Sequence, residues 1–322
     1  MLYVILPCYN SERYLSKCLD SIFNQTFKDF LLVVVNDGST DSTQIFLNSY
    51  INKHKNIVLI DQSNQGSSSA RNHGLEFVLS KSNEKDIITF IDSDDYIKED
   101  YFETHMGLLN EYNSDIVCSG YIVNNINKNK FKKVKVLNKE DAVKSILKDF
   151  LINSHSHHKF YKCKMWQNVF YPKNLSLFED VATIYKTFLN SSTVVCTPYC
   201  GYYYVMHSEN SISHSKATNK NIFSTLEAIK LQINFINESE YKNKKYLKIL
   251  KHNFAHRLIS KYSRLDLINC EPTDLEKAQE MLKFYRENKC SRYYFPLSFK
   301  LFIRKIIFNI NPKTYYNIFH KK

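Results

Sequence analysis

Short runs of apolar residues alternate with amphipathic stretches over the first 120 residues of the chain. Runs rich in Val and Ile predict strands at 2–6, 30–35, 57–60, 87–91 and 116–118. Because these runs are apolar on both faces, they are typical of buried strands in a parallel sheet. Apolar residues at helical spacing predict helices from about 15 to 23, after 41, and from about 67 to 80. This alternation predicts βαβ units and an α/β fold with a mostly parallel, open sheet.

The pattern changes after Gly120. Residues 121–138 are polar and predict a hairpin whose turn lies near 127–130. Further along we predict helices at 139–150 and 180–190, short strands at 193–196 and 201–205, and helical segments from 219 to about 285. The chain is therefore expected to have three parts: a ligand-binding half at 1–120, a second half of the same domain at 121–215, and a helical C-terminal region at 216–322.

The chain has 322 residues and a formal net charge of +12, and this charge is unevenly distributed. Residues 1–120 carry 9 Lys/Arg and 17 Asp/Glu, 121–282 carry 25 and 14, and 283–322 carry 10 and 1. A basic chain with 23 Tyr and 22 Phe could bind nucleic acid, but such a binder would not be expected to begin with an acidic domain. The acidic part is expected to hold a cation or a polar ligand, and the basic tail could meet an anionic surface.

Three features of the sequence favour a cytoplasmic location. No apolar run approaches the roughly 20 residues that span a bilayer. The N-terminus lacks the basic leader and the small-residue cleavage site of a signal peptide. The eight cysteines include no Cys-x-x-Cys pair, which favours free thiols in a reducing compartment.

Polar residues follow the first three predicted strands, at the edge where an open parallel sheet binds its ligands. Tyr9 offers a flat face on which a nucleobase could stack. Asp37 could accept the imide N–H of a pyrimidine, and Gly38 allows the backbone to turn tightly. Arg71 could meet a phosphate. Taken alone, each residue has a structural alternative: a core Tyr, a capping Asp or a surface Arg.

The fourth predicted strand is followed by the acidic run Asp92-Ser93-Asp94-Asp95. Carboxylates ~6–7 Å apart repel one another by about 2.5 kcal/mol per pair at an effective dielectric constant near 20. A bound divalent cation removes this repulsion, and oxygen ligands suit Mg²⁺ or Mn²⁺. The alternative is an acidic turn in water. Because the run stands where the sheet is expected to bind a ligand, we predict a metal site there.

The residues after the strands belong to four longer stretches: VILPCYNSERYLSKCLDSIFNQTF, LLVVVNDGSTDST, DQSNQGSSSARNHGLEF and ITFIDSDDY. In this order and spacing they cover most of residues 2–120 and resemble the family 2 glycosyltransferases, which have the GT-A fold. The resemblance implies a nucleotide-diphosphate sugar donor, usually a UDP-sugar, and transfer with inversion. It implies that Tyr9 stacks on uracil, that Asp37 holds the N3–H of this base, and that Arg71 lies near the nucleotide.

The same resemblance assigns roles to the acidic run. Asp92 would reach the ribose or the donor sugar. Asp94, with Asp95 beside it, would bind the Mn²⁺ or Mg²⁺ that bridges the diphosphate. The implied donor-binding set is completed by Pro7, Asn10, Glu12, Asn64, Gly66 and Ser93.

The second half of the chain resembles the family more loosely. The stretches HKFY at 158–161, FED at 178–180 and YYYVMH at 202–207 stand where the family has an Asn-Lys-Leu-Tyr-like stretch, a Glu-Asp pair opening a helix, and a Tyr-rich strand. The resemblance implies that Asp180 is the catalytic base, whereas an Asp in a first helical turn could also serve only as a cap.

Cations and histidines near these stretches are the remaining candidates. The resemblance implies that Lys159 and His207 lie near the diphosphate, and His158 stands where the family has Asn. The run HSHH at 155–158 offers three histidines but no fourth zinc ligand at a suitable spacing. We therefore expect it to form a surface loop or an acceptor-facing loop.

The last residues, 293–322, mix Tyr, Phe and Ile with Lys and Arg. Such a stretch could lie on an anionic membrane or pack its apolar face on the protein. The resemblance implies a hexosyl- or N-acetylhexosaminyltransferase that acts on a hydroxyl of a surface glycan (capsule, O-antigen or lipooligosaccharide) or its lipid-linked precursor. It would work in the cytoplasm or at the inner face of the cell membrane, without nucleic acid as a partner. The alternatives are a non-catalytic partner subunit with the same fold and, less favoured, a basic nucleic-acid-binding protein.

Overall fold

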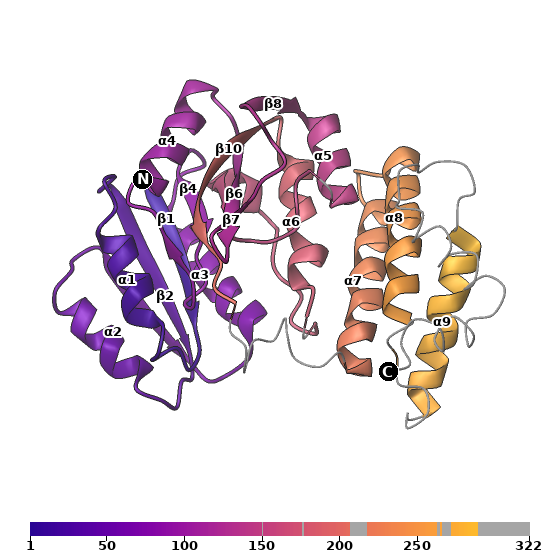
Figure 1. Ribbon diagram of the computed structural model, residues 1–322, viewed down its shortest axis with the longest axis horizontal. Coiled ribbons are helices and arrows are strands. Elements are labelled where there is room, and N and C mark those ends of the chain that lie inside the picture. The colour runs from indigo at the N-terminus through magenta and orange to yellow at the C-terminus, as the bar shows by residue number, and fades with distance from the viewer. Residues whose placement is uncertain (150, 176, 207–217, 263–264, 266–271, 289–322) are drawn as a thin grey trace. The chain divides into compact units, whose positions relative to one another are not determined.

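The computed structural model describes residues 1–149, 151–175, 177–206, 218–262, 265 and 272–288 (Figure 1). Two compact units are present. The first consists of Met1–Asn174 and Glu179–His207, and the second of Leu175–Phe178 and Ser208–Lys322. Two sequence predictions, for His207 at the diphosphate and for the tail 293–322 at a membrane, lie outside the described residues.

A ten-stranded sheet forms the first unit, with the order β3-β2-β1-β4-β9-β6-β10-β5 and with β7 and β8 paired to β6 and β10 (Figure 1). The strands are β1 Leu2–Cys8, β2 Phe30–Asp37, β3 Ile57–Gln62, β4 Ile87–Phe90, β5 Tyr96–Ile97, β6 Ile116–Val123, β7 Ile126–Lys128, β8 Lys135–Asn138, β9 Lys159–Lys162 and β10 Thr193–Tyr203. Strands β3, β2, β1 and β4 are parallel, as are β6 and β10, whereas β9 is antiparallel to both β4 and β6. The predicted α/β fold is confirmed.

Helices connect these strands. They are α1 Leu15–Phe23, α2 Thr43–Ile51, α3 Ser67–Lys81, α4 Tyr101–Glu111, α5 Lys139–Lys148, a 3₁₀ helix at Cys163–Trp166 and α6 Glu179–Asn190. Strand β1 shows why apolar residues are needed at every position. Val4 and Leu6 belong to the same buried cluster as Leu19 of α1, on one face of the sheet. Ile5 points to the other face, where a Cβ added to Gly74 of α3 would lie 2.6 Å from its Cγ2, so glycine allows α3 to approach the strand closely.

The structure differs from the sequence prediction between residues 121 and 205. The hairpin turn lies at Asn124 and Asn125, which have φ angles of 48° and 61°, and not at 127–130. Asparagine tolerates this left-handed conformation better than most residues do. The two short strands predicted at 193–196 and 201–205 are one strand, β10, whose register shifts between Cys196 and Tyr202. Helix α4 and the short strands β5 and β9 were not predicted.

The second unit contains the helices α7 Asn219–Glu238, α8 Lys244–Tyr262 and α9 Pro272–Asn288 (Figure 1). Helix α7 begins after Thr218, whose hydroxyl accepts a hydrogen bond from the backbone N–H of Asn221. Its buried face includes Leu226, Ile229 and Ile236. None of the helices in the described ranges is both long and apolar enough to cross a bilayer.

Candidate active site

The loops after β2 and β3 are joined by the carboxylate of Asp37. This side chain is 3% exposed and accepts hydrogen bonds from the side-chain amide of Gln62 (2.6 Å) and from the backbone N–H groups of Gln65 and Gly66 (both 2.8 Å). A Cβ at Gly38, where φ is +67°, would lie 2.7 Å from the backbone nitrogen of Asn64. The two loops therefore form one tightly packed surface, from which Asn64 and Gly66 remain exposed.

The loop after β1 is tied to the loop after β2. Asn10, with φ of 47°, donates its backbone N–H to Ser39 Oγ (3.1 Å) and accepts a hydrogen bond from the backbone N–H of Thr40 (2.8 Å). Glu12 accepts one from the backbone N–H of Ser42 at 2.9 Å. Pro7 lies near the end of β1, and Tyr9, the first residue after this strand, is 50% exposed. Its ring is therefore available for stacking, and its role toward a base stays a prediction.

The acidic run after β4 divides into two environments. Asp95 is buried, and its carboxylate accepts hydrogen bonds from the hydroxyl of Tyr202 (2.6 Å) and the backbone N–H of Val205 (2.8 Å). This carboxylate therefore anchors the loop to β10 and its end. Ser93 Oγ lies 2.6 Å from Ser11 Oγ, which ties the same loop to the one after β1.

Asp94 and Asp92 form the other part of the run. Burial and the neighbouring charge of Asp92 raise the pKa of Asp94 to about 6. A cation nearby would oppose both effects, and carboxylate oxygens are suitable ligands for Mg²⁺ or Mn²⁺. The carboxylate oxygens of Asp94 and Asp92 are therefore suitable ligands for a divalent metal ion.

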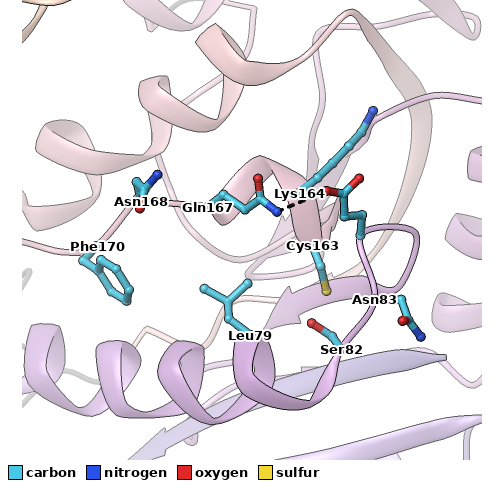
Figure 2. Close-up of a pocket in the computed structure, with 9 residues that line it drawn as sticks. Leu79, Ser82, Asn83, Cys163, Lys164, Gln167, Asn168 and Phe170 are labelled. Carbon is cyan, nitrogen blue, oxygen red and sulfur yellow. Dashed lines mark hydrogen bonds between the residues drawn. The ribbon is translucent and has the colours of Figure 1, made fainter.

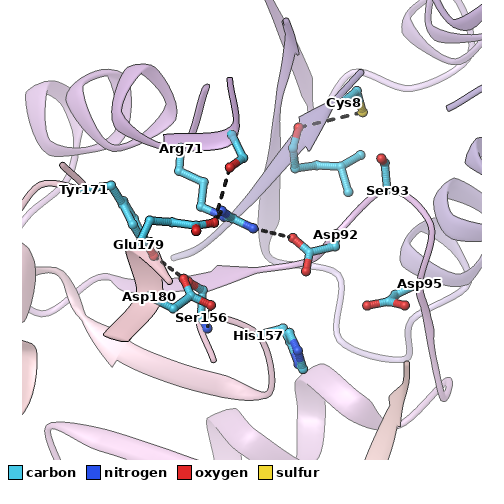
Figure 3. Close-up of polar contacts among 12 residues, drawn as sticks. Cys8, Arg71, Asp92, Ser93, Asp95, Ser156, His157, Tyr171, Glu179 and Asp180 are labelled. Carbon is cyan, nitrogen blue, oxygen red and sulfur yellow. Dashed lines mark hydrogen bonds and ion pairs between the residues drawn. The ribbon is translucent and has the colours of Figure 1, made fainter. Parts of the chain in front are cut away.

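Arg71 of α3 connects the acidic run to the start of α6. Its guanidinium lies 2.9 Å from Asp92 Oδ1 and 2.9 Å from Glu179 Oε1, and the residue is 7% exposed (Figure 3). Glu179 also accepts a hydrogen bond from Ser67 Oγ at 3.2 Å, at the beginning of α3. Arg71 was predicted near a nucleotide, and the structure places its charge between two carboxylates. Two acidic regions far apart in the sequence are thus brought together around one cation.

Asp180 follows Glu179 in the first turn of α6. The backbone N–H of Ser156 donates to Asp180 Oδ2 at 3.0 Å, and the Ser156 hydroxyl forms a short hydrogen bond with Oδ1 (Figure 3). Burial raises the pKa of Asp180, while Arg71 and Ser156 oppose this shift. The carboxylate is therefore oriented by its neighbours and has a proton affinity above that of an ordinary Asp, which suits a general base.

Lys159 lies in the interior of the first unit. Its side chain is fully buried, and Nζ donates to Asn153 Oδ1 (3.0 Å) and to the carbonyl oxygen of His155 (2.7 Å). The amine therefore braces the segment before β9. This placement does not support the predicted position of Lys159 at a diphosphate, because its hydrogen bonds are directed at the protein.

The histidines at 155, 157 and 158 gather with their candidate ligand atoms within 4.8 Å of one another. However, Nδ1 of His157 and Nδ1 of His158 lie 2.7 Å apart, and His158 Nε2 lies 3.0 Å from Asn153 Oδ1 and 3.4 Å from Lys159 Nζ. A buried ammonium so close opposes a metal cation. Burial lowers the pKa of all three rings, which keeps them neutral. The segment is a hydrogen-bonded interior cluster, so the expectation of a surface loop was wrong.

A separate cavity of about 350 Å³ lies at the C-terminal end of α3 (Figure 2). Its lining includes Leu79, Cys163, Gln167 and Phe170. Helix α3 begins beside the candidate site, and its 15 residues extend about 22 Å from there. Burial raises the pKa of Cys163 to about 11, so this thiol is not a reactive thiolate. We therefore do not assign the cavity to the active site.

Comparison with known proteins identifies the family. The model of glycosyl transferase family 2 matches residues 3–171, which is more than half of the chain. The chain belongs to glycosyl transferase family 2. The resemblance noted in the four sequence stretches is thus confirmed, and these stretches contribute the loops that meet in the site.

Curated relatives of this family 2 chain are longer proteins. The minor teichoic acid biosynthesis protein GgaB of Bacillus subtilis is 29% identical over 300 residues, which are 88% of this chain and 31% of GgaB. Glycosyltransferase GlyA of Streptococcus pneumoniae is 45% identical over 118 residues, which are 37% of this chain and 16% of GlyA. The chain therefore spans about a third or less of the length of these two relatives.

The fold of the family is also found among solved structures. The crystal structure of residues 1–349 of Staphylococcus aureus TarS has a TM-score of 0.68 at 22% identity, and covers 89% of this chain and 80% of that one. TarS 1–349 in complex with UDP-GlcNAc has a TM-score of 0.60 at 19% identity, and covers 91% of this chain and 93% of that one. These likenesses confirm the GT-A fold.

Three residues of this family 2 site were missed by sequence reasoning: Ser156, Tyr171 and Tyr202. Tyr202 lies in the Tyr-rich stretch, so the sequence indicated that its position belongs to the site. The sequence did not indicate its contact with Asp95. Ser156 lies among histidines, and Tyr171 lies in a loop before α6. Neither residue type nor spacing indicated their contact with each other.

Proposed function

We propose that this chain is an inverting glycosyltransferase that moves a sugar from a UDP-sugar to a hydroxyl group of a bacterial surface glycan or its lipid-linked precursor. Its membership of glycosyl transferase family 2 supports this reaction class. Relatives named for minor teichoic acid biosynthesis and for poly(ribitol-phosphate) glycosylation support a surface polymer as the acceptor. The TarS structure that holds UDP-GlcNAc supports a UDP-sugar as the donor.

The observation that carries the proposal is the link made by Arg71. It joins Asp92, in the loop proposed to hold the donor, to Glu179, which is next to Asp180. An inverting transfer needs a base at the acceptor and compensation for the charge that grows on the leaving diphosphate. The acceptor hydroxyl oxygen attacks the anomeric carbon, the bond from this carbon to the diphosphate oxygen breaks, and Asp180 takes the hydroxyl proton.

We assign the metal site to Asp94 together with Asp92, because the carboxylate of Asp95 is buried against Tyr202 and Val205. A bound Mn²⁺ or Mg²⁺ would neutralise charge on the diphosphate. The residues proposed to hold the nucleotide are Pro7, Tyr9, Asn10, Glu12, Asp37, Asn64, Gly66 and Ser93. Arg71 contributes to the site through its ion pair with Asp92. Lys159 is not included among the residues that hold the UDP-sugar, because its amine is directed inward.

Among surface glycans, the relatives favour a polymer of the teichoic acid type. Two of them are named poly(ribitol-phosphate) β-glucosyltransferase and poly(ribitol-phosphate) β-N-acetylglucosaminyltransferase. We therefore propose that the transferred group is a hexose or an N-acetylhexosamine. We also propose that the enzyme works at the cytoplasmic face of the membrane, where lipid-linked precursors are available.

Thermal unfolding with a panel of nucleotide sugars tests the donor. We expect UDP-glucose or UDP-N-acetylglucosamine to raise Tm in the presence of Mn²⁺, GDP-mannose to leave Tm unchanged, and EDTA to reduce the effect. A ligand at 100 times its Kd stabilises the folded state by about 2.7 kcal/mol, which is readily measured. Release of UDP in the presence of poly(ribitol phosphate) then tests transfer. No shift with any UDP-sugar and no UDP release would refute the proposed function.

A further inference from the structure

Ser156 makes two hydrogen bonds to the carboxylate of Asp180. Its backbone N–H donates to Oδ2 and its hydroxyl contacts Oδ1, so that one residue holds both oxygens (Figure 3). Ser156 is 1% exposed and lies in the segment before β9, whereas Asp180 lies in α6. This contact therefore fixes the carboxylate from outside its own helix.

The number of available protons fixes the direction of these hydrogen bonds. An ionised carboxylate only accepts, and a serine hydroxyl has one proton to donate. When Asp180 is ionised, the Ser156 hydroxyl donates to Oδ1, and its oxygen accepts the proton of the Tyr171 hydroxyl, which lies 2.7 Å away. The result is a chain of donors from Tyr171 through Ser156 to Asp180. This arrangement matches the state in which Asp180 can accept a proton from an acceptor hydroxyl.

We propose that Ser156 is a positioning residue for the catalytic base: with Tyr171 behind it, Ser156 holds Asp180 ionised and in a fixed orientation. The inference rests on the proposed function, because it assigns a support to the base named there. Ser156 and Tyr171 touch neither the donor nor the acceptor in this proposal. They act through Asp180.

Other charged and titratable groups also act on Asp180. They are Glu179 beside it on α6, Arg71 of α3, Asp92 after β4, Tyr171, and Lys159 and Tyr161 of β9. Burial raises the pKa of Asp180 most strongly, and the charge of Arg71 and the hydrogen bonds of Ser156 oppose it. Removing the Ser156 hydroxyl takes away one of these opposing interactions and leaves the others in place. The pKa of Asp180 should then rise further.

The test compares kcat between pH 5 and 9 for the wild-type chain, Ser156→Ala, Ser156→Thr and Tyr171→Phe, with saturating UDP-sugar and Mn²⁺. Loss of a hydrogen bond to a carboxylate should move the acid limb of the Ser156→Ala profile upward by about one pH unit. At a pH below the pKa of Asp180 this shift lowers kcat by roughly tenfold, and the difference should disappear at a pH above it. Ser156→Thr, which keeps the hydroxyl, should restore the limb, and Tyr171→Phe should shift it in the same direction by less.

Ser154→Ala is the matched control. Ser154 is also buried in the segment before β9, but its backbone N–H and hydroxyl bond Asp149. The kcat profile of Ser154→Ala should have the same acid limb as that of the wild type. A Ser156→Ala chain that is folded, keeps the wild-type acid limb and differs only in Tm overturns the inference. Should Ser156→Thr fail to fold, the shift in Tyr171→Phe decides in its place.

Failure of the inference differs from failure of the proposed function. If Asp180→Asn abolishes transfer while Ser156→Ala behaves as the wild type, the base stands and its support by Ser156 does not. If the wild-type chain transfers from no UDP-sugar, or if Asp180→Asn remains active, the assignment of the base is lost and the inference with it.

Discussion

Arg71→Met removes the cation between Asp92 and Glu179 and should destabilise the first unit strongly. The guanidinium is 2.9 Å from both carboxylates, and its side chain is 9% exposed. Removing one partner of a buried ion pair costs about 3–5 kcal/mol, because the other charge stays buried without compensation. The Asp92 side chain is 26% exposed and can gain water, so we expect a value near the lower end, about 3 kcal/mol. This is a large part of a typical stability of about 5–15 kcal/mol.

The assay is urea unfolding followed by the fluorescence of Trp166. It is the one tryptophan of the chain and is fully buried in the first unit against Phe90, so it reports on this unit. Burial raises the pKa of Glu179 and Asp180 even with Arg71 present, and both values should rise further without it. A carboxyl group with a raised folded pKa is stabilising below its unfolded pKa and loses this contribution as the pH rises through the folded pKa. The deficit of Arg71→Met should therefore be small near pH 4 and should grow as the pH rises through the folded pKa of these carboxyl groups.

Lys164→Met provides the control for the loss of a less buried cation. Lys164 Nζ lies 2.9 Å from Asp115 Oδ1, but its side chain is 39% exposed, and Lys162 also contacts Asp115 at 3.5 Å. We expect a loss below about 1 kcal/mol. Arg71→Lys should be intermediate, since its compact ammonium keeps the charge but lacks the wide planar fork with which the guanidinium reaches both carboxylates. A loss under about 1 kcal/mol for Arg71→Met at pH 7, or an equal loss at pH 4 and pH 7, would refute this reasoning.

The other predictions concern the reaction and the tail. Asp180→Asn should lower kcat by roughly 10²–10⁴ while the chain stays folded and UDP binding is unchanged, and near-normal turnover would exclude Asp180 as the base. Asp94→Asn should abolish the metal-dependent part of the Tm increase caused by UDP-sugar. Asp29 is exposed before β2, at the opposite end of the strands, and Asp29→Asn should keep this part of the increase. Equal behaviour of the two variants would contradict the metal site. A chain ending at residue 289 should sediment less with anionic liposomes, and unchanged sedimentation would rule out the tail as the membrane contact.

The first four strands could be predicted because their signal is local. Val4, Ile5 and Leu6 are apolar on both faces since helices cover both, and this is visible in any short window of sequence. The carboxyl ends of these strands then define the edge of the sheet at which Tyr9, Asp37 and Asp92 lie. Helix α4 could also have been found, because its buried residues Tyr101, Phe102, His105 and Leu109 recur at helical spacing.

The interactions that organise the site could not be predicted, because they join distant residues. Arg71 and Glu179 are 108 positions apart, and no local pattern shows that an arginine on α3 faces the start of α6. Lys159 shows the same limit. The family resemblance implies that it lies near the diphosphate, whereas the structure shows its amine buried and bonded to Asn153 and a backbone carbonyl. Burial of a charged side chain depends on such partners, and composition does not reveal them.

The charge balance of the site gives an independent reason to expect metal dependence. In the part of the chain that the structure describes, the carboxylates of Asp92, Asp94, Glu179 and Asp180 all act on the single guanidinium of Arg71. The ammonium of Lys159 donates its hydrogen bonds to neutral oxygens, and its single charge added to that of Arg71 does not balance these four carboxylates. A diphosphate would add further negative charge to a region that already has more anions than cations, and at an effective dielectric constant near 20 each close like pair costs about 2.5 kcal/mol. We therefore expect UDP to bind appreciably only together with a divalent cation, whatever sugar it carries.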